Sequence, residues 1–322
     1  MRAVVFNRYG PPEVLRLEDV ERPVPKEDEV LVKVHATTVA RTDTGLRSAE
    51  YGFMRLFTGL RRPRQRIPGI ELAGVVEEAG TAVAEFVVGD RVFGIGSATN
   101  ADFVRVRASG TLAHMPSNVS FAEAAAIADG GCTARAFLEQ VRAARGQRIL
   151  VYGASGSIGT AAVQLAKHLG AVVIAFCGPD GMDVVRSLGA DEVFDFRERD
   201  VTEGGETYDV IVDAVGKLSA RHARRALEPK GIYTTAGSPG SLGGVLALSL
   251  VTKITGTRRV RLGLARYRRQ YLLFLKELVE TGAYRPVIDR SYALEDVVEA
   301  HRYVDTQRKI GNVVLTVDDS NR

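Results

Sequence analysis

The chain has 322 residues, 45% hydrophobic and 25% charged, which is the composition of a globular protein with room for two domains. Its formal charge of +4 sets 43 basic residues against 39 acidic ones, and the arginines at 61–66 and 258–269 lack the aromatic interleaving of a nucleic-acid surface. No apolar run reaches the roughly 18 residues of a membrane span and the N-terminus lacks a signal peptide's apolar core, so we expect a cytoplasmic protein without nucleic-acid or membrane partners.

The first part of the chain, up to residue 120, contains short β-rich runs separated by turn residues. Strands are expected at 3–6, 30–34, 73–77, 91–94 and 103–106. Short strands at this spacing are typical of a small or partly open β-barrel.

A helix is expected after residue 120, because Ser120 is a suitable N-cap and Glu123 stands at capping-box spacing. From residue 146 onward, strands and helices alternate. The strands are expected at 149–152, 172–176, 193–196, 210–212 and 231–235, and the helices at 158–169, 182–188 and 222–227. The alternation predicts a doubly wound α/β domain. Past residue 257 it fades, and helices at 271–281 and 294–304 precede a closing strand at 313–317.

A glycine-rich turn joins the first of these strands to its helix, with the sequence Gly153-Ala154-Ser155-Gly156-Ser157-Ile158-Gly159. The first glycine permits a tight turn, the middle one lets a pyrophosphate approach the backbone, and the last lets the helix pack closely on the strand. The helix N-terminus offers N–H groups and a positive dipole to the phosphates. A turn kept only for packing is the alternative, but the strand before and the helix after favour a dinucleotide site.

The tip of the second strand, Cys177-Gly178, is expected near the adenosine ribose. An uncharged tip leaves room for a 2′-phosphate and favours NADP(H). Asp180 could instead accept a hydrogen bond from the 2′-hydroxyl of NAD(H), or cap the helix that follows. We therefore expect NADP(H) or NAD(H), with a lean to NADPH.

Short motifs in a fixed order extend over nearly the whole chain around this turn. They are Asp43 and the segments 68–74 (PGIELAG), 89–92 (GDRV), 124–126 (AAA), 133–134 (TA), 188–191 (LGAD), 213–216 (DAVG) and 309–311 (KIG). In these motifs the chain resembles the medium-chain dehydrogenase/reductase superfamily, in its zinc-free quinone oxidoreductase branch. The resemblance implies a GroES-like β-rich catalytic domain over 1–120 and a Rossmann domain over 121–257. The C-terminal segment, 258–322, would complete the catalytic domain, and the active site would lie in the cleft between the two domains.

The zinc-dependent alcohol dehydrogenases of this superfamily hold catalytic zinc with Cys, His and Cys, and the matching positions here are Ala40, Ile70 and Asp129. One carboxylate falls far short of a three-ligand site. Cys132 stands near the third position without matching it, and with Cys177 it makes only two cysteines, too few for a four-cysteine structural site. We therefore expect no zinc.

The resemblance also implies roles for single residues along the cofactor. Thr133 would lie near the nicotinamide, unless it is an ordinary helix threonine. Arg197 could bind a 2′-phosphate or remain a solvated surface arginine. The other implied cofactor contacts are Gly153, Ser155, Gly156, Ser157 and Ile158 at the pyrophosphate, Cys177, Gly178 and Phe196 toward the adenosine, Val215 and Gly216 at the ribose, and Gly237 and Ser238 beside the nicotinamide.

Two residues are candidates for a catalytic role, Tyr51 and Thr133. Tyr51 falls where the branch often has a tyrosine facing the substrate, and it could donate a hydrogen bond to the reduced carbonyl or serve only for packing. Asp43 is expected to pair with an arginine such as Arg47. Ala40 replaces the Asn that is usual in the branch, which leaves the acceptor open.

Oxidising an alcohol without a metal is difficult, whereas an activated acceptor takes hydride readily. We therefore expect an NAD(P)H-dependent, zinc-independent reductase of quinones or α,β-unsaturated carbonyls, in which the protein supplies positioning. The alternatives are a zinc-free alcohol dehydrogenase or carbonyl reductase, and a cofactor-binding sensor with little turnover. The family implies a homodimer through the Rossmann sheet edge near 232–255, with the apolar stretch 245–251 as a candidate surface.

Overall fold

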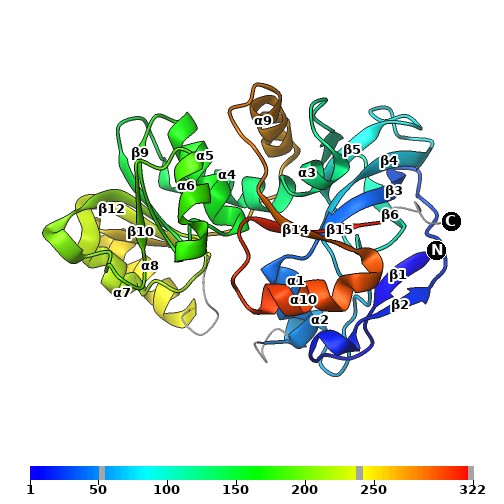
Figure 1. Ribbon diagram of the computed structural model, residues 1–322, viewed down its shortest axis with the longest axis horizontal. Coiled ribbons are helices and arrows are strands. Elements are labelled where there is room, and N and C mark those ends of the chain that lie inside the picture. Colours follow the sequence, from blue (N-terminus) through cyan, green and yellow to red (C-terminus); the bar gives the residue numbers. More distant parts are fainter. Residues whose placement is uncertain (51–54, 237–241, 318–322) are drawn as a thin grey trace. The chain divides into compact units, whose positions relative to one another are not determined.

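The computed structural model describes residues 1–50, 55–236 and 242–317. The chain forms two compact units, one of Met1–Asp129 with Tyr267–Arg322 and one of Gly130–Arg266, and Figure 1 traces it through both. Within the described ranges, every helix is too short or too polar to cross a bilayer.

The first unit is built on a seven-stranded sheet in the order β14-β15-β3-β4-β5-β7, with β6 paired to β3. Because β15 pairs antiparallel with β3, the C-terminal segment completes the sheet that the first part of the chain begins. A separate antiparallel pair consists of β1 (Arg2–Val5) and β2 (Arg16–Asp19). The strands of the main sheet are β3 (Glu29–Thr38), β4 (Glu71–Ala79), β5 (Arg91–Ile95), β6 (Phe103–Arg107), β7 (Leu112–His114), β14 (Ile288–Ala293) and β15 (Asn312–Thr316).

The core of the first unit lies between this sheet and the helices packed on it. Val30, Val32 and Val34 alternate along β3 and are at most 1% exposed, as the two-residue period of a strand requires. Val297 and Val304 of α10 belong to the same cluster. The helices of this unit are α1 (Arg41–Ser48), α2 (Arg55–Thr58), α3 (Phe121–Ala125), α9 (Arg269–Glu280) and α10 (Val297–Asp305), with 3-10 turns η1 (Pro12–Val14) and η7 (Leu294–Asp296).

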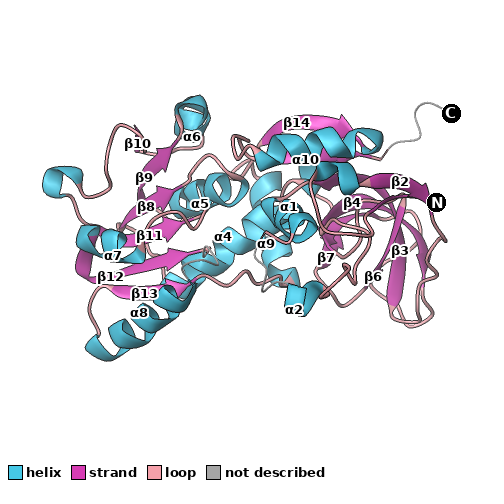
Figure 2. Ribbon diagram, turned by 90° about the horizontal axis from the view of Figure 1, so that it is seen from below, coloured by secondary structure: helices cyan, strands magenta, loops and turns pink. Residues whose placement is uncertain are grey.

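The second unit contains a six-stranded, fully parallel sheet in the order β10-β9-β8-β11-β12-β13. Numbered within the unit this is the order 3-2-1-4-5-6 of a dinucleotide-binding fold, which confirms the predicted doubly wound domain. Figure 2 shows helices flanking this sheet. The strands are β8 (Arg148–Tyr152), β9 (Val172–Cys177), β10 (Glu192–Asp195), β11 (Tyr208–Asp213), β12 (Leu227–Thr235) and β13 (Arg259–Leu262), and the helices are α4 (Ala128–Val141), α5 (Ser157–His168), α6 (Met182–Ser187), α7 (Ala220–Ala223) and α8 (Leu242–Thr255), with short 3-10 turns at Pro179–Gly181, Glu203–Gly205 and Arg224–Ala226.

Strand β8 is covered on both faces. Leu150 belongs to an apolar cluster with Ala223 of α7 and Val245 of α8. Its neighbours Ile149 and Val151 point to the opposite face and are 0% exposed as well. Its carboxyl end lies where the strand order reverses, which is the place where doubly wound sheets bind ligands.

Two details differ from the sequence expectations. The units divide after Asp129 and Arg266, whereas we expected boundaries after residues 120 and 257, because α3 packs on β3 and β4 and because β13 pairs with β12. The helix expected over 222–227 is wrong in its second half, since α7 ends at Ala223 and β12 begins at Leu227 after one 3-10 turn.

Candidate functional site

The turn of residues 153–159 leaves β8 and enters α5. Gly153 has a φ of +76°, a conformation that glycine adopts without strain. The N–H groups of Gly153 and Ala154 donate to the carbonyl of Phe176 at 2.8 and 3.0 Å, which ties the turn to β9. Gly156 is the N-cap of α5 and contributes no side-chain cap. The N–H groups of the first helical turn are therefore left for a ligand such as a phosphate.

Close contacts explain the glycines at both ends of the turn. A Cβ on Gly159 would lie 2.2 Å from the carbonyl oxygen of Gly153 and 2.7 Å from Ala154 Cα, so any side chain would push α5 away from β8. A Cβ on Gly153 would lie 2.6 Å from Val215 Cγ1. Val215, an implied ribose contact, therefore lies against the glycine turn.

Asp213, at the end of β11, shapes the segment that carries Val215. Its Oδ1 accepts the N–H groups of Val215 at 3.2 Å and Gly216 at 2.9 Å. Its Oδ2 accepts the hydroxyls of Tyr233 at 3.0 Å and Thr235 at 3.1 Å. Burial raises the pKa of this carboxyl, while these hydrogen bonds favour its charged form. Asp213 therefore holds in place the loop that carries Val215 and Gly216, the two implied ribose contacts.

The tips of β9 and β10 form a partly apolar surface beside the turn. Cys177 is buried, and burial raises the pKa of its thiol to about 11, so it is neutral at pH 7. Phe196 is 45% exposed, and a Cβ on Gly178 would lie 3.7 Å from its ring. A Cβ on Gly181 would lie 2.4 Å from Ser155 Cβ, so this surface adjoins the glycine turn. The implied adenosine contacts are thus close together in the second unit.

Arg197 forms a bidentate ion pair with Asp195, with Nε 3.1 Å from Oδ1 and Nη2 2.7 Å from Oδ2. The hydrogen bonds of this pair raise the pKa of the guanidinium and lower that of the carboxyl. The charge of Asp180, on the turn after β9, also favours the charged form of Arg197. Two carboxylates, Asp195 and Asp180, therefore lie near Arg197, the cation that could bind a 2′-phosphate. The Arg197 side chain is 57% exposed, so a ligand can still reach it.

Helix α4 meets the glycine turn through Gly130, because a Cβ on Gly130 would lie 2.3 Å from Ser157 Oγ. This hydroxyl is buried and has no hydrogen-bond partner among the described residues. Thr133 is 3% exposed and follows Gly130 by three residues, which places it on the same side of the helix. Thr133 therefore lies on the side of α4 that meets the glycine turn, and its place near the nicotinamide stays a prediction.

These residues fit a nicotinamide dinucleotide. The N-terminus of α5 offers N–H groups to a pyrophosphate, the first residue of α5 carries the unpartnered Ser157 hydroxyl, and the exposed Phe196 ring can cover an adenine. The cradle also requires its glycines, since a side chain at position 153 or 159 would occupy space already filled by protein atoms.

In the first unit, Asp43 holds the start of α1 against the loop before β4. Its Oδ2 accepts the N–H of Ala40 at 2.8 Å and its Oδ1 accepts the N–H of Gly69 at 3.2 Å. Burial raises the pKa of Asp43 to about 7. The expected pairing with Arg47 is wrong, because backbone N–H groups occupy the Asp43 oxygens and Arg47 pairs with Asp305 at 2.8 Å.

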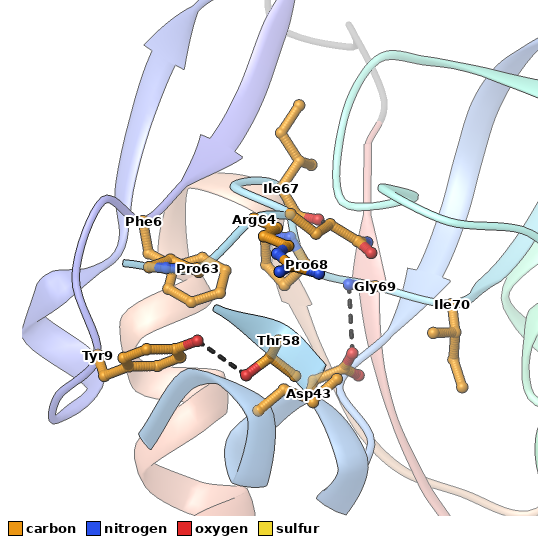
Figure 3. A pocket seen from close by; sticks show the side chains of 12 residues that line it. Phe6, Tyr9, Asp43, Thr58, Pro63, Arg64, Ile67, Pro68, Gly69 and Ile70 are labelled. Carbon is orange, nitrogen blue, oxygen red and sulfur yellow. Dashed lines mark hydrogen bonds between the residues drawn. The ribbon is translucent and has the colours of Figure 1, made fainter. Parts of the chain in front are cut away.

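Asp43 also lines a cavity of about 250 Å³, which Figure 3 shows from close by. At one end the hydroxyl of Tyr9 lies 2.8 Å from that of Thr58. A mainly apolar lining that also includes the Asp43 carboxyl and Arg64 suits a small, largely apolar molecule. The other lining residues are Phe6, Leu46, Pro63, Arg64, Gln65, Ile67, Pro68, Gly69 and Ile70.

The three positions that match zinc ligands also lie in the first unit. Ala40 is the N-cap of α1, Ile70 directly precedes β4, and Asp129 lies in the first turn of α4. Asp129 Oδ1 accepts the hydroxyl of Tyr267 at 2.7 Å. Across the described residues, no three His, Cys, Asp or Glu side chains gather as metal ligands.

Three predicted site residues, Tyr51, Gly237 and Ser238, lie outside the described residues. The remaining cofactor residues of the second unit lie at or just after the carboxyl ends of β8 to β11, or on α4. Sequence reasoning assigned no role of their own to Asp213, Gly130 or Asp195. Asp213 carried a signal, because it ends a buried strand and a glycine follows three residues later, where a tight loop must be held.

Comparison with known proteins agrees with this geometry. Residues 26–144 match the family model of the alcohol dehydrogenase GroES-like domain, and residues 188–315 match that of a zinc-binding dehydrogenase. The quinone oxidoreductase of Lama guanicoe is 34% identical, with 98% of this chain and 97% of that protein covered. The chloroplastic NADPH-dependent alkenal/one oxidoreductase of Arabidopsis thaliana is 29% identical, with 98% and 79% covered.

A solved structure of Escherichia coli quinone oxidoreductase complexed with NADPH superposes with a TM-score of 0.80 at 25% identity, covering 98% of this chain and 100% of that one. The GroES-like first domain implied by the resemblance is confirmed by the family match. The chain belongs to the medium-chain dehydrogenase/reductase superfamily, in its quinone oxidoreductase branch.

Proposed function

We propose that this protein is an NAD(P)H-dependent, zinc-independent oxidoreductase that reduces quinones or α,β-unsaturated carbonyls. The observation that carries the proposal is the glycine turn at the reversal point of the parallel sheet, in a chain 34% identical to a quinone oxidoreductase. A reduced nicotinamide, when bound, supplies hydride to the acceptor.

The residues of the chain bind and orient the cofactor. The N–H groups of Ser155, Ser157 and Ile158 and the dipole of α5 hold the pyrophosphate, and the Ser157 hydroxyl gains a partner there. The N–H of Gly156 donates to the carbonyl of Gly153 at 3.2 Å, so Gly156 contributes by letting the pyrophosphate approach the backbone. Val215 and Gly216, held by Asp213, border the ribose. Thr133 supports the nicotinamide end. Quinones and enones accept hydride without a Lewis acid, so their reduction does not require zinc. The proposed reaction is therefore compatible with a chain in which Asp129 is the one possible ligand at the three zinc-ligand positions.

The cavity beside Asp43 receives the ring of the acceptor. Its mainly apolar lining favours a largely apolar ring, and its size suits a small one. Leu46→Phe narrows the cavity, and we expect the KM of a two-ring quinone to rise about tenfold. The Kd of NADPH, measured by fluorescence titration, stays within twofold. An unchanged KM for large and small quinones would place the acceptor elsewhere.

NADPH is the preferred cofactor, with Arg197 facing the 2′-phosphate beside the uncharged tip at Cys177 and Gly178. The exposure of the Arg197 side chain supports this role. Its ion pair with Asp195 limits how strongly NADPH is preferred over NADH. Arg197→Ala is expected to raise the KM of NADPH while leaving that of NADH. Asp180→Asn lowers the KM of NADPH if the charge opposes phosphate, and raises that of NADH if Asp180 accepts the 2′-hydroxyl.

The experiment that tests the function uses purified protein with NADPH or NADH and a panel of quinones, enals and enones. We expect cofactor-dependent reduction of at least one class, with zinc far below one atom per chain by metal analysis. Alcohol oxidation or simple carbonyl reduction by the protein without zinc would identify a zinc-free alcohol dehydrogenase or carbonyl reductase instead. Tight NADPH binding without turnover of any acceptor would identify a cofactor sensor.

The protein forms a homodimer through the β13 edge of the Rossmann sheet. β13 ends the strand order, and the outer face of α8 beside it carries four exposed apolar side chains, Leu246, Leu250, Val251 and Ile254. An unpaired edge next to such a face suits a second copy of the chain. Ile254→Glu is expected to shift light scattering from dimer to monomer, whereas Val88→Glu, at an exposed valine of the first unit, does not.

The protein works in the cytoplasm. Its two cysteines are buried and free, which suits a reducing compartment. Cell fractionation with an antibody against the native protein tests this localisation, and recovery in a membrane or extracellular fraction contradicts it.

A further inference from the structure

The lining of the cavity in the first unit comes from three segments that are far apart in the sequence. The first is the segment 6–10, the second is α1, and the third is the segment 58–70 (Figure 3). Tyr9 belongs to the first segment and Leu46 to the second. The width of the cavity therefore depends on the bonds that hold these segments together.

Tyr9 ties the first segment to the third. Its hydroxyl donates to the carbonyl of Gly59 at 2.7 Å and lies 2.8 Å from the hydroxyl of Thr58. The guanidinium carbon of Arg55, at the start of α2, lies 5.1 Å from the centre of the Tyr9 ring. Because the ring is held at its hydroxyl end, it cannot turn away from the cavity without breaking these hydrogen bonds.

Arg47 ties the first segment to α1 and to α10. Its side chain is 2% exposed, and its guanidinium is bonded in three directions. Nε donates to the carbonyl of Gly10 at 3.1 Å, Nη2 pairs with Asp305 at 2.8 Å, and Nη1 lies 3.2 Å from Nδ1 of His301. A guanidinium has donors only, so Nδ1 of His301 is the acceptor. Burial and the charge of Arg47 lower the pKa of His301 to about 3, so its imidazole is neutral and able to accept this bond.

The hydrogen bonds between Arg47 and Gly10 run in both directions. The carbonyl of Arg47 accepts the N–H of Gly10 at 3.1 Å, in addition to the bond that its Nε donates. Gly10 directly follows Tyr9, and Arg47 directly follows Leu46, so these bonds lie one residue away from two side chains that line the cavity. A planar guanidinium holds its partners in fixed directions, whereas the ammonium of lysine is a single nitrogen on a flexible chain. The spacing of Tyr9 and Leu46 therefore depends on the guanidinium, which a lysine of equal charge does not replace.

We propose that Tyr9 determines the size of the acceptor that the cavity admits, and that Arg47 is the positioning residue that holds Tyr9 in place against α1. The inference rests on the proposed function, in which the cavity receives the ring of the acceptor. The Tyr9 ring then contacts the acceptor without taking part in a bond that forms or breaks. Its selectivity is steric, because a larger acceptor has to displace the ring and a smaller one packs against it.

The test of Tyr9 measures the KM of a one-ring and a two-ring acceptor, of whichever class the wild type reduces, at saturating NADPH. Tyr9→Ala removes the ring and enlarges the cavity. We expect the KM of the two-ring acceptor to fall about fivefold and that of the one-ring acceptor, which loses a contact, to rise about fivefold. The ratio of the two KM values then changes about 25-fold, in the direction opposite to Leu46→Phe, while the Kd of NADPH stays within twofold.

The test of Arg47 uses Arg47→Lys, which keeps the charge and loses the planar fork. A loosened Tyr9 can move aside, so we expect the KM ratio to change in the same direction as in Tyr9→Ala, by about threefold or more. When Arg47→Lys is combined with Tyr9→Ala, the ratio should stay at the Tyr9→Ala value, because the ring through which Arg47 acts is absent. A role of Arg47 in stability alone would lower Tm and leave the ratio unchanged.

A second variant, Asp305→Asn, loosens Arg47 at a carboxylate that is 32% exposed. It removes the charge that holds Nη2 and should change the KM ratio in the same direction, so Arg47 stays testable if Arg47→Lys does not fold. Arg2→Lys is the matched control. Arg2 also forms an ion pair between distant segments, with Asp102 at 2.9 Å, and neither residue lines the cavity. Its KM ratio should equal that of wild type.

The outcomes for Tyr9 and Arg47 are separable from the outcome for the function. If wild type turns over acceptors and Tyr9→Ala keeps the wild-type KM ratio, Tyr9 does not determine acceptor size and the function stands. If Arg47→Lys and Asp305→Asn leave the ratio unchanged, or if the effect of Arg47→Lys adds to that of Tyr9→Ala in the double variant, Arg47 does not act through Tyr9. If wild type turns over no acceptor, the function and the inference are both wrong.

Discussion

At the scale of single residues, the glycine turn keeps its shape because Gly153 and Gly159 have no Cβ atom. The carbonyl of Gly153 occupies the position next to Gly159 where any larger residue would place its Cβ, at 2.2 Å. No side chain can rotate away from such a contact, because both partners are backbone or Cβ. The packing around the turn therefore explains why the motif has glycine at positions 153 and 159, and the role of the motif in binding a cofactor stays a prediction.

Gly159→Ala is predicted to weaken NADPH binding. Relieving the contact must move the turn, and overpacking of this kind costs about 1–3 kcal/mol. We expect the Kd measured by fluorescence titration to rise about tenfold or more. Gly244→Ala is the control, because its Cβ on α8 meets no atom within 4 Å. Equal Kd values for both variants would contradict the role of the turn.

Other residue-scale features could not be predicted from the sequence. Arg47 is fully buried and contacts His301 and Asp305, which are 254 and 258 residues away in the chain. A neighbour in sequence, Asp43, was therefore a plausible but wrong partner. Tyr267 and Asp129, separated by 138 residues, likewise carry no local pattern that connects them.

At the scale of elements, local capping fixes where α3 begins. The hydroxyl of Ser120 accepts the N–H of Glu123, and the Glu123 carboxylate accepts the N–H of Ser120 at 2.8 Å. Both partners lie within four residues, so the sequence alone predicted this start correctly.

Ser120→Ala is predicted to destabilise the protein by about 1 kcal/mol through loss of the cap. In thermal melting this corresponds to a fall of roughly 2–4 °C in Tm. Ser219→Ala provides the control, because Ser219 is the N-cap of α7 but forms no side-chain cap hydrogen bond. A Tm for Ser120→Ala as high as that of the control would show that the cap contributes nothing.

Strand β8, which is covered on both faces, could be predicted, whereas β13, at one edge of the same sheet, could not. β8 is a continuous apolar run because helices cover both sides of it. β13, in contrast, alternates Arg259, Val260, Arg261 and Leu262 at the end of the sheet, and its sequence looks like part of a basic surface. α8 has apolar residues on its exposed face too, so it lacks the polar side that marks an ordinary surface helix.

At the scale of the whole molecule, buried carboxyls make stability depend on pH. The folded-state pKa values of Asp43 and Glu71 are raised to about 7 and about 8, above their ordinary values of 3.8 and 4.5. Between the ordinary and the raised pKa values, the folded chain holds protons on these two carboxyls that the unfolded chain has released. Stability is therefore greatest below the unfolded values and falls as pH rises through the folded ones.

We predict that wild-type Tm falls between pH 5 and pH 9 by at least about 2 °C, on the scale where 1 kcal/mol shifts Tm by a few degrees. Glu71→Gln cannot ionise, so its Tm should fall less over the same range in differential scanning calorimetry. Glu78→Gln, at an exposed glutamate of the same strand, should retain the wild-type slope. A wild-type Tm that rises through this range would refute the buried carboxyl account.

The central claim is that a nicotinamide bound at the glycine turn passes hydride directly to the carbon of an activated acceptor. The most direct measurement is the reaction of wild-type protein with an enone and NADPH that carries deuterium at the transferable position, followed by mass spectrometry of the product. We predict a reduced product with one deuterium on carbon, and a parallel loss of product in Gly159→Ala at the same cofactor concentration. A reduced product without deuterium, or no product from enones and quinones alike, would contradict the claim.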